Sequence, residues 1–394
     1  MIKTAQRDTW LDYLRATITV LVVAHHSSLA YTTFARFNKE AYISSTHPIV
    51  DNKRWIGMDI FENFNDIFFM SLMFLIGGLF LTKSIAKKGT LAFIRDRCLR
   101  LFIPFIFIGT LSNLIAHFPS FYIAHNDSNI KAYIVDFFTV EQWPVGPPWF
   151  IWILFLFNLL FALIYTFGKN IFTYTSDRIS RLGNHPLLCF ILLAILTWIL
   201  YVPVAYNIGA GTWIGWGPFD FQLSRILLYF GYFMTGAIIG SSDFHKGIFA
   251  GDAPLVRKWK MWVALALAVY LILIISGANN TLKNLVVKGL LSEFAAWMIY
   301  YTIYVFSCTL SCIAFVSTFR ALANTPGAWM DSLAGNAYLI YLIHYIFVIW
   351  TQMSLLDLAI PAFVKFLIVF LNALALSWMI SIFLRRFQII KKYL

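Results

Sequence analysis

Arg15 and His26 lie in the first strongly apolar segment of the chain, where a membrane interior tolerates few polar residues. Eleven positions separate them. On a helix this spacing gives about 16 Å of rise and returns to within about 20° of the starting direction, so both side chains are predicted to share one face. The ordinary pKa of imidazole lies near neutrality, which is typical of a general base. A histidine that only hydrogen-bonds between helices is the structural alternative.

The composition places the whole chain in a membrane. Of the 394 residues, 60% are hydrophobic and 12% are charged, whereas soluble domains carry about 25% charged residues. The apolar residues form long blocks, which predicts one all-α polytopic domain over residues 1–394. About ten blocks are long enough to span a bilayer: 14–33, 64–82, 101–118, 148–167, 186–204, 221–240, 260–276, 294–316, 336–353 and 362–384.

The basic residues predict the orientation of these helices. The two ends of the chain and alternate connections hold 21 of the 30 lysines and arginines, and the other connections hold seven. The positive-inside rule therefore predicts that both termini are cytoplasmic in a cell inner (plasma) membrane. The remaining two, Arg225 and Lys365, lie just inside the outer ends of two spans and are expected to snorkel.

The charge and the cysteines argue against other classes of protein. The net charge of +12 comes largely from short connecting loops, which favours contact with the lipid bilayer over nucleic-acid binding. None of the four cysteines falls in a predicted external loop, so no disulfide framework is expected. Cys308 and Cys312 are four apart, and with no second pair they indicate helix packing and no metal site.

Four motifs, in order along the chain, resemble those of the acyltransferase-3 family of integral membrane O-acyltransferases. LDYLRATITVLVVAHH resembles the first helix of the family, and FIRDRCLRLFIP resembles its cytoplasmic basic loop. GPPWFIWILFLFNLLF resembles the entry to its fourth helix, and AYLIYLIHYIFV resembles its late Tyr-x-Ile-Tyr-Leu-x-His motif. The matching positions are Arg15, His26, Arg97, Arg100, Pro104, Gly146, Trp149, Phe150, Tyr338, Tyr341 and His344.

The resemblance implies transfer of an acyl group, foremost acetyl from acetyl-CoA, to a hydroxyl of a surface or periplasmic glycan or a related acceptor. The subgroup that acylates periplasmic glucans is the most similar. Acyl-CoA is then a co-substrate, and no permanently bound cofactor is implied. One departure is Gly77 in MFLIGGLF, where the family usually has serine, so a role for that hydroxyl does not carry over.

Three arginines are candidates for binding the acyl donor. Arg15 is expected to bind the anionic head of CoA while the pantetheine arm runs along the helix toward His26. Arg97 and Arg100 are expected to add phosphate contacts, because guanidinium matches phosphate in bidentate fashion. The alternative is that all three are ordinary positive-inside residues.

The histidines are the candidates for the chemistry itself. His26 is expected to take the proton of the acceptor hydroxyl as its oxygen attacks the thioester, and a transient acyl-histidine is the open alternative. His344 follows Tyr341 by three residues, so both are expected to line the same pocket, with packing as the alternative. His25 points about 100° away from His26 and is expected to be structural.

The acceptor is expected to meet polar and aromatic residues near the outer ends of the helices. Asp59, Glu62 and Asp66 have i, i+3, i+7 spacing on one helix face, where Asp66 is the candidate to bind sugar hydroxyls or to orient His26. A solvated face is the alternative for the other two. Trp149 is a candidate to stack on a sugar ring, and an interfacial belt residue is its alternative. The loops 34–60, 119–147 and 207–219 are expected to hold the substrate.

Two other functions compete with acyl transfer. A proton-coupled secondary transporter or flippase for an envelope precursor also uses buried histidine and arginine. Such proteins often show internal repeats and matching broken helices, and no such pair is evident in this sequence. A non-catalytic envelope scaffold would not need His26.

Overall fold

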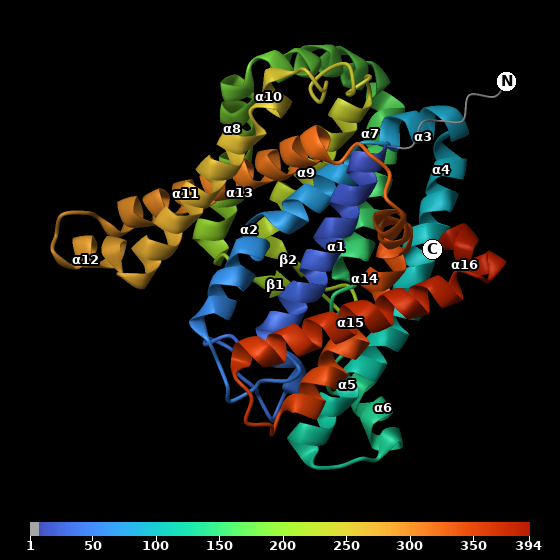
Figure 1. Ribbon diagram of the computed structural model, residues 1–394, viewed down its shortest axis with the longest axis vertical. Coiled ribbons are helices and arrows are strands. Elements are labelled where there is room, and N and C mark those ends of the chain that lie inside the picture. The colour runs from blue at the N-terminus through green and yellow to red at the C-terminus, as the bar shows by residue number, and fades with distance from the viewer. Residues whose placement is uncertain (1–7) are drawn as a thin grey trace.

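The computed structural model describes residues 8–394, which form a helical bundle (Figure 1). Within this range, nine helical segments are long and apolar enough to cross a membrane. Each overlaps one predicted block, and the remaining block, 14–33, corresponds to α1 (Thr9–Leu29). The prediction of an all-α polytopic membrane fold is therefore confirmed.

The nine segments and their connections have the following bounds. The first half contains η1 (Tyr42–Ser44), α2 (Ile56–Gly78), α3 (Leu81–Lys88), α4 (Thr90–Arg97), the π-helical segments η2 (Cys98–Phe102) and η3 (Phe105–Gly109), α5 (Thr110–His125), α6 (Ile130–Thr139), α7 (Trp149–Ser180), η4 (Arg181–Asn184) and α8 (Pro186–Ile208). The second half contains β1 (Trp213–Ile214), β2 (Phe221–Gln222), η5 (Leu223–Arg225), α9 (Ile226–Gly240), α10 (Pro254–Arg257), α11 (Trp259–Ala278), α12 (Thr281–Val287), α13 (Glu293–Leu322), α14 (Ala328–Leu355), α15 (Ala362–Leu384) and α16 (Gln388–Tyr393).

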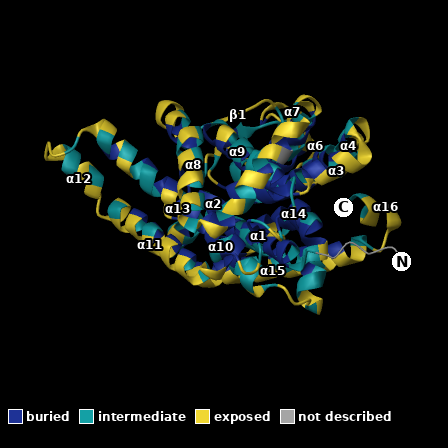
Figure 2. Cartoon of the chain, turned by 90° about the horizontal axis from the view of Figure 1, so that it is seen from above, coloured by how far each residue is buried: buried dark blue, intermediate teal, exposed yellow. Residues whose placement is uncertain are grey.

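The centre of the bundle is built by α1, α2, α13 and α14. In the most apolar stretch of the α2–α3 segment 72% of the residues are buried, and the value is 67% for α13 and for α14, against 22% for α8, α11 and α15 (Figure 2). Helices α8, α11 and α15 are strongly apolar and largely exposed, which suits contact with lipid. Helix α1 carries histidine, serine and threonine, and polar side chains in membrane helices face the bundle interior. This is why α1 lies against α2 and α14 at the centre.

Small residues let α2 and α9 approach closely. A Cβ atom added to Gly236 would lie 2.0 Å from the carbonyl oxygen of Leu75, and one added to Gly240 would lie 1.8 Å from that of Leu79. Only glycine fits at such contacts, as is common where membrane helices cross.

Two helices deviate from regular geometry for identifiable reasons. Pro104 stands between η2 and η3, and because proline lacks a backbone N–H, the helix adjusts with π-helical turns on both sides. Helix α7 bends at Gly168 (φ −123°, ψ 25°), where the predicted block 148–167 also ends.

Two predictions about polar residues in the spans are wrong. Arg225 and Lys365 do not snorkel, because their side chains are 7% and 0% exposed and form buried ion pairs with Asp66 and Asp51. A buried charge is stabilised far better by a partner carboxylate at this depth than by a distant water layer. Sequence analysis also missed the antiparallel pair β1–β2, in which Trp213 of the predicted loop 207–219 is paired with Gln222.

Candidate functional site

A cavity of about 990 Å³ reaches from the loops into the centre of the bundle. This volume is near the upper end of the roughly 300–1,000 Å³ found for ligand pockets. Its walls come from α1, α2 and α14, and from loop residues in 41–48, 140–147 and 213–222. The three loops singled out by the sequence therefore meet over one cavity. Its polar and charged side chains include His25, His26, His47, Glu62, Asp66, His117, Glu141, Asp220, Gln222 and the tyrosines Tyr42, Tyr229, Tyr341 and Tyr345.

His26 and His344 are in direct contact. His344 Nδ1 lies 2.8 Å from the carbonyl oxygen of Tyr341, so this nitrogen carries a proton and donates it. The Nε2 atom of neutral His344 is then an acceptor, and it lies 3.1 Å from Nδ1 of His26. His26 Nδ1 also lies 3.0 Å from the carbonyl oxygen of Val22, so it is the protonated nitrogen of His26. These contacts leave the lone pair of His26 on Nε2.

Nε2 of His26 is available for a reactant. It makes no hydrogen bond to the described residues, and its ring lines the cavity. His344 is fully buried at 0% exposure and does not line the cavity. His26 therefore lines the cavity, whereas His344 contacts His26 on the side away from the cavity.

Tyr341 holds the loop that precedes α7. Its hydroxyl donates a hydrogen bond to the carbonyl oxygen of Pro147. The neighbouring Gly146 has φ +55°, and a Cβ atom there would overlap the side chain of Asn113. Asn113 in turn donates from its amide to the carbonyl oxygen of Val145. Tyr341 thus positions a wall of the cavity as well as lining it.

Gln352 and His47 fix the end of α1 beside His26. Gln352 Nε2 donates to the carbonyl oxygens of His26 and Ser27 at 3.3 Å each. Its Oε1 accepts from Nε2 of His47 at 2.8 Å. Burial lowers the pKa of His47 to about 3, and the hydrogen bond to Gln352 opposes this shift. His47 is therefore neutral near pH 7, with Nδ1 as its acceptor atom.

Asp66 is held by an arginine from another helical segment. The guanidinium of Arg225 donates to both carboxylate oxygens of Asp66, at 2.9 and 2.6 Å, and to the backbone oxygen of Asp66 at 3.0 Å. Asp66 lines the cavity, whereas Arg225 does not. Asp66 is not in contact with His26, so the structure does not support orientation of His26 by Asp66.

The three candidate donor-binding arginines lie away from this cavity. Arg15 is exposed and forms an ion pair with Asp12 at 3.6 Å. Arg100 is exposed and pairs with Asp96 at 3.2 Å. Arg97 lies over the ring of Phe93 at 5.0 Å, and its buried Nε has no hydrogen-bond partner. None of the three lines the cavity in this structure.

Trp149 lies at the site and is not confined to an interfacial belt. It lines the cavity, and its ring meets Trp213 edge-on at 5.4 Å and Tyr229 at 5.9 Å. The β1–β2 pair supplies Trp213, so the element that sequence analysis missed contributes one of the aromatic rings.

Several cavity residues had no distinguishing signal in the sequence. His47, His117, Glu141 and Asp220 are separated along the chain and match no motif. His25 was expected to be structural, yet it lines the cavity 4.0 Å from Glu62. The signal that was present is a polar residue in or beside an apolar segment, and it does not say which such residues share a cavity.

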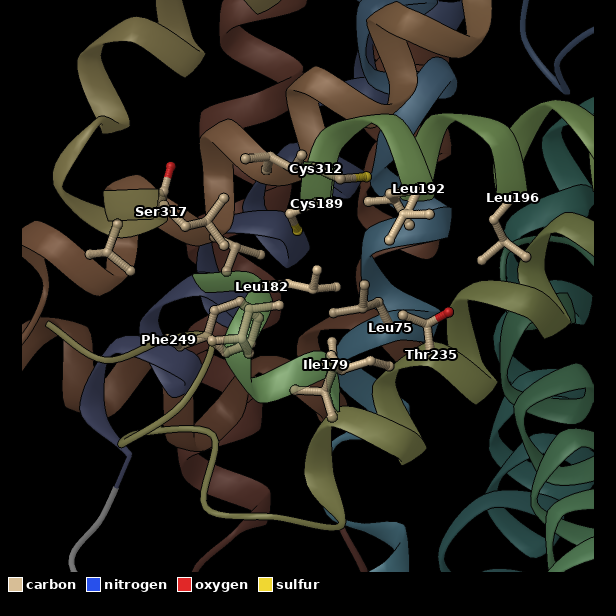
Figure 3. Close-up of a pocket in the computed structure, with 17 residues that line it drawn as sticks. Leu75, Ile179, Leu182, Cys189, Leu192, Leu196, Thr235, Phe249, Cys312 and Ser317 are labelled. Carbon is tan, nitrogen blue, oxygen red and sulfur yellow. The ribbon is translucent and has the colours of Figure 1, made fainter. Parts of the chain in front are cut away.

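A second cavity of about 190 Å³ has a different character (Figure 3). Leu75, Leu182 and Phe249 are among the apolar side chains around it. Its few polar side chains are Cys189, Thr235, Cys312 and Ser317, and it contains no histidine or carboxylate. It therefore lacks a group able to act as a general base, and the candidate site is the larger cavity.

Comparison with known proteins identifies the family of the chain. The acyltransferase domain of the acyltransferase-3 family matches residues 8–382. Glucans biosynthesis protein C of Escherichia coli O139:H28 (strain E24377A / ETEC) is 24% identical over 281 residues, which cover 68% of this chain and 66% of that protein, slightly under two thirds of its length. No solved structure matches the chain. Since the family match includes α1, α14 and the loops that enclose the cavity, the chain belongs to the acyltransferase-3 family of membrane acyltransferases.

Proposed function

We propose that the protein transfers an acyl group, foremost acetyl from acetyl-CoA, to a hydroxyl of a surface or periplasmic glycan. The observation that carries the proposal is the lone pair of His26 Nε2, which faces a large polar cavity while Nδ1 is tied to His344 and Val22. A histidine with one nitrogen oriented by a protein group and the other free is the arrangement of a general base.

The proposed reaction uses His26 twice. An acceptor hydroxyl in the cavity gives its proton to Nε2 as its oxygen attacks the carbonyl carbon of the thioester. The carbon–sulfur bond then breaks, and the departing CoA sulfur takes the proton from Nε2, so His26 ends neutral. His344 Nε2 stabilises the transient imidazolium by accepting from its Nδ1–H, a role that the distance of 3.1 Å supports.

The donor is proposed to approach from the end of α1 opposite the cavity mouth. Arg15 lies eleven residues before His26, which is about 16 Å along the helix, and exposed guanidinium groups bind phosphate. Arg97 has a buried and unpartnered Nε, which supports a further contact. Since none of the three arginines lines the cavity, the thioester is proposed to reach His26 through a local separation of α1 from a neighbouring helix.

The proposed topology follows from the same arrangement. Both termini are cytoplasmic in the inner membrane, the three arginines meet cytoplasmic acyl-CoA, and the loop-lined cavity meets an external acceptor. The relative named for glucan biosynthesis supports a glycan as acceptor.

The test supplies purified protein with radiolabelled acetyl-CoA and an envelope glycan fraction. Loss of the base is expected to lower the rate by about 10²–10⁴-fold, so His26→Ala should lose nearly all label transfer at equal folded yield. The matched control is His125→Ala, which removes an exposed histidine outside the cavity lining. Equal transfer by wild type and His26→Ala would refute the assignment. For the donor site, Arg15→Ala and Arg97→Ala should raise the KM for acetyl-CoA, and an unchanged KM would count against it.

A further inference from the structure

The charged groups around the large cavity are of one sign. Four carboxyl groups line it, those of Glu62, Asp66, Glu141 and Asp220. Among the residues that the structure describes, no lysine or arginine lines it. The guanidinium of Arg225 is close by, but both of its terminal nitrogens are bound to Asp66.

The other three carboxyl groups have no cationic partner among the described residues. Glu62 faces His25 at 4.0 Å, and its side chain is 16% exposed. Glu141 is 5% exposed and accepts backbone hydrogen bonds from Ile43, at 3.2 Å, and from Tyr42. No ion pair involves Asp220 in the described part of the chain. A protonated carboxyl group supplies no positive charge either, so neither protonation state offsets an entering anion.

The aromatic lining gives the same cavity a surface for uncharged rings. Trp149, Trp213, Tyr42 and Tyr229 line it together with the carboxyl groups. Carboxyl oxygens accept hydrogen bonds from hydroxyl groups, and aromatic faces bind the apolar faces of rings. This combination binds a polyhydroxyl chain without needing charge on it.

The positive residues of the same region lie outside the cavity. Arg36, Lys39, Lys53 and Arg54 are exposed on the 34–55 loop and do not line the cavity. These four cations are therefore not among the groups that line the cavity.

We propose that the cavity selects an uncharged glycan as acceptor and excludes anionic glycans, because Glu62, Glu141 and Asp220 leave it with uncompensated carboxyl groups and no lining cation. This inference rests on the acyl transfer proposed above and names the class of its acceptor. Membership of the family alone does not determine the charge of the acceptor. Like-charge repulsion is a means of rejecting a competing anionic substrate.

The test measures binding of two oligosaccharides by isothermal titration calorimetry with purified protein at pH 8, where ordinary imidazole is neutral. One probe is a neutral β-linked glucose hexasaccharide, and the other has a single glucuronic acid in place of one glucose. The anionic probe is expected to bind roughly tenfold more weakly or worse, because its carboxylate would lose hydration in the cavity without a lining cation to offset that loss. The difference should persist at high salt, which screens buried charges much less than exposed ones.

Variants identify the groups responsible. Glu62→Gln combined with Asp220→Asn should narrow the ratio of the two affinities, whatever its effect on the affinity for the neutral probe. The matched control is Asp127→Asn, which removes an exposed carboxylate outside the cavity lining and should leave the difference unchanged.

Three results would overturn the inference: equal binding of both probes, an unchanged difference in the double variant, or binding of neither probe. Failure of the proposed function is distinguishable, because it appears as selective binding of the neutral probe without any acetyl transfer from acetyl-CoA. Selective binding by itself supports the inference.

Discussion

Replacing His344 with leucine separates the role of this residue from that of His26. His344 is completely buried and contacts His26 only through Nε2, at 3.1 Å from Nδ1. The substitution removes this acceptor but leaves the carbonyl oxygen of Val22 at 3.0 Å. His26 then keeps one of its two acceptors, and its Nδ1–H tautomer remains favoured.

The expected loss follows from that geometry. The hydrogen bond is already present with neutral His26, so only its strengthening on the imidazolium, about 0.5–1.5 kcal/mol, lowers the barrier, and each 1.36 kcal/mol in the barrier is tenfold in rate. His344→Leu should therefore lower kcat by roughly 2- to 13-fold. His26→Ala removes the base itself and should cost about 10²–10⁴-fold.

The assay is acetyl transfer from radiolabelled acetyl-CoA at saturating acceptor, with folded yield matched by size-exclusion chromatography. The KM for each substrate should stay unchanged in His344→Leu, because the side chain does not line the cavity. His344→Gln supplies an amide oxygen as acceptor and should recover most of the rate. If His344→Leu is as inactive as His26→Ala, or fully active, the assigned roles of the two rings are wrong.

The remaining predictions concern buried charges and pH. Asp66→Asn should lower the free energy of unfolding by about 3–5 kcal/mol, because it leaves a buried guanidinium unpaired. Arg225→Met should lower it by less, since the Asp66 side chain is 34% exposed against 7% for Arg225. The opposite order in thermal unfolding in detergent would contradict this. Lys365→Met should also lower the free energy of unfolding by about 3–5 kcal/mol, because Lys365 and Asp51 are 0% and 2% exposed. Adding Asp51→Leu should restore most of the lost free energy. A double variant as unstable as Lys365→Met would argue against the ion pair as the cause. The pKa of His47 is about 3 in the folded protein and 6.5 ordinarily. Between these two pH values His47 binds a proton in the unfolded chain but not in the folded one. The free energy of unfolding therefore falls as the pH drops below about 6.5. His47→Gln should therefore reduce the acid-induced decrease in melting temperature, and an identical decrease would show that His47 does not contribute.

Much of the fold follows from the sequence because a bilayer restricts what a chain can do. A segment in lipid must satisfy its own backbone hydrogen bonds, so each long apolar block predicts a helix. Helix ends were less predictable. Helix α2 begins at Ile56, whereas the predicted block begins at 64. The predicted start was late because Asp59 and Glu62 make the first turns of the helix less apolar. These residues are polar by composition but are enclosed by the loops and by α1.

The pairing of Arg225 with Asp66 shows where sequence reasoning failed. The position of Arg225 near a helix end indicated snorkelling, since a long side chain near lipid normally reaches for water. Asp66 lies 159 positions away in the chain, and nothing local to either residue reveals that they meet. The same applies to Gln352, which joins His47 to the end of α1 only because α14 packs beside it.

By itself, the sequence determined that the chain is helical and membrane-embedded, and that His26 and His344 are the histidines of its motifs. Local periodicity and hydropathy suffice for the first conclusion, since both depend on neighbours along the chain, and the resemblance of the motifs to those of the acyltransferase-3 family supplies the second. The packing of α1 against α14 decided that the two imidazoles touch and which nitrogen of His26 stays free. Helix α2 and two distant loops together decided that the cavity is lined by carboxyl groups and has no lining lysine or arginine among the described residues. Contacts between remote segments depend on how whole helices pack, and no single stretch of sequence contains that information.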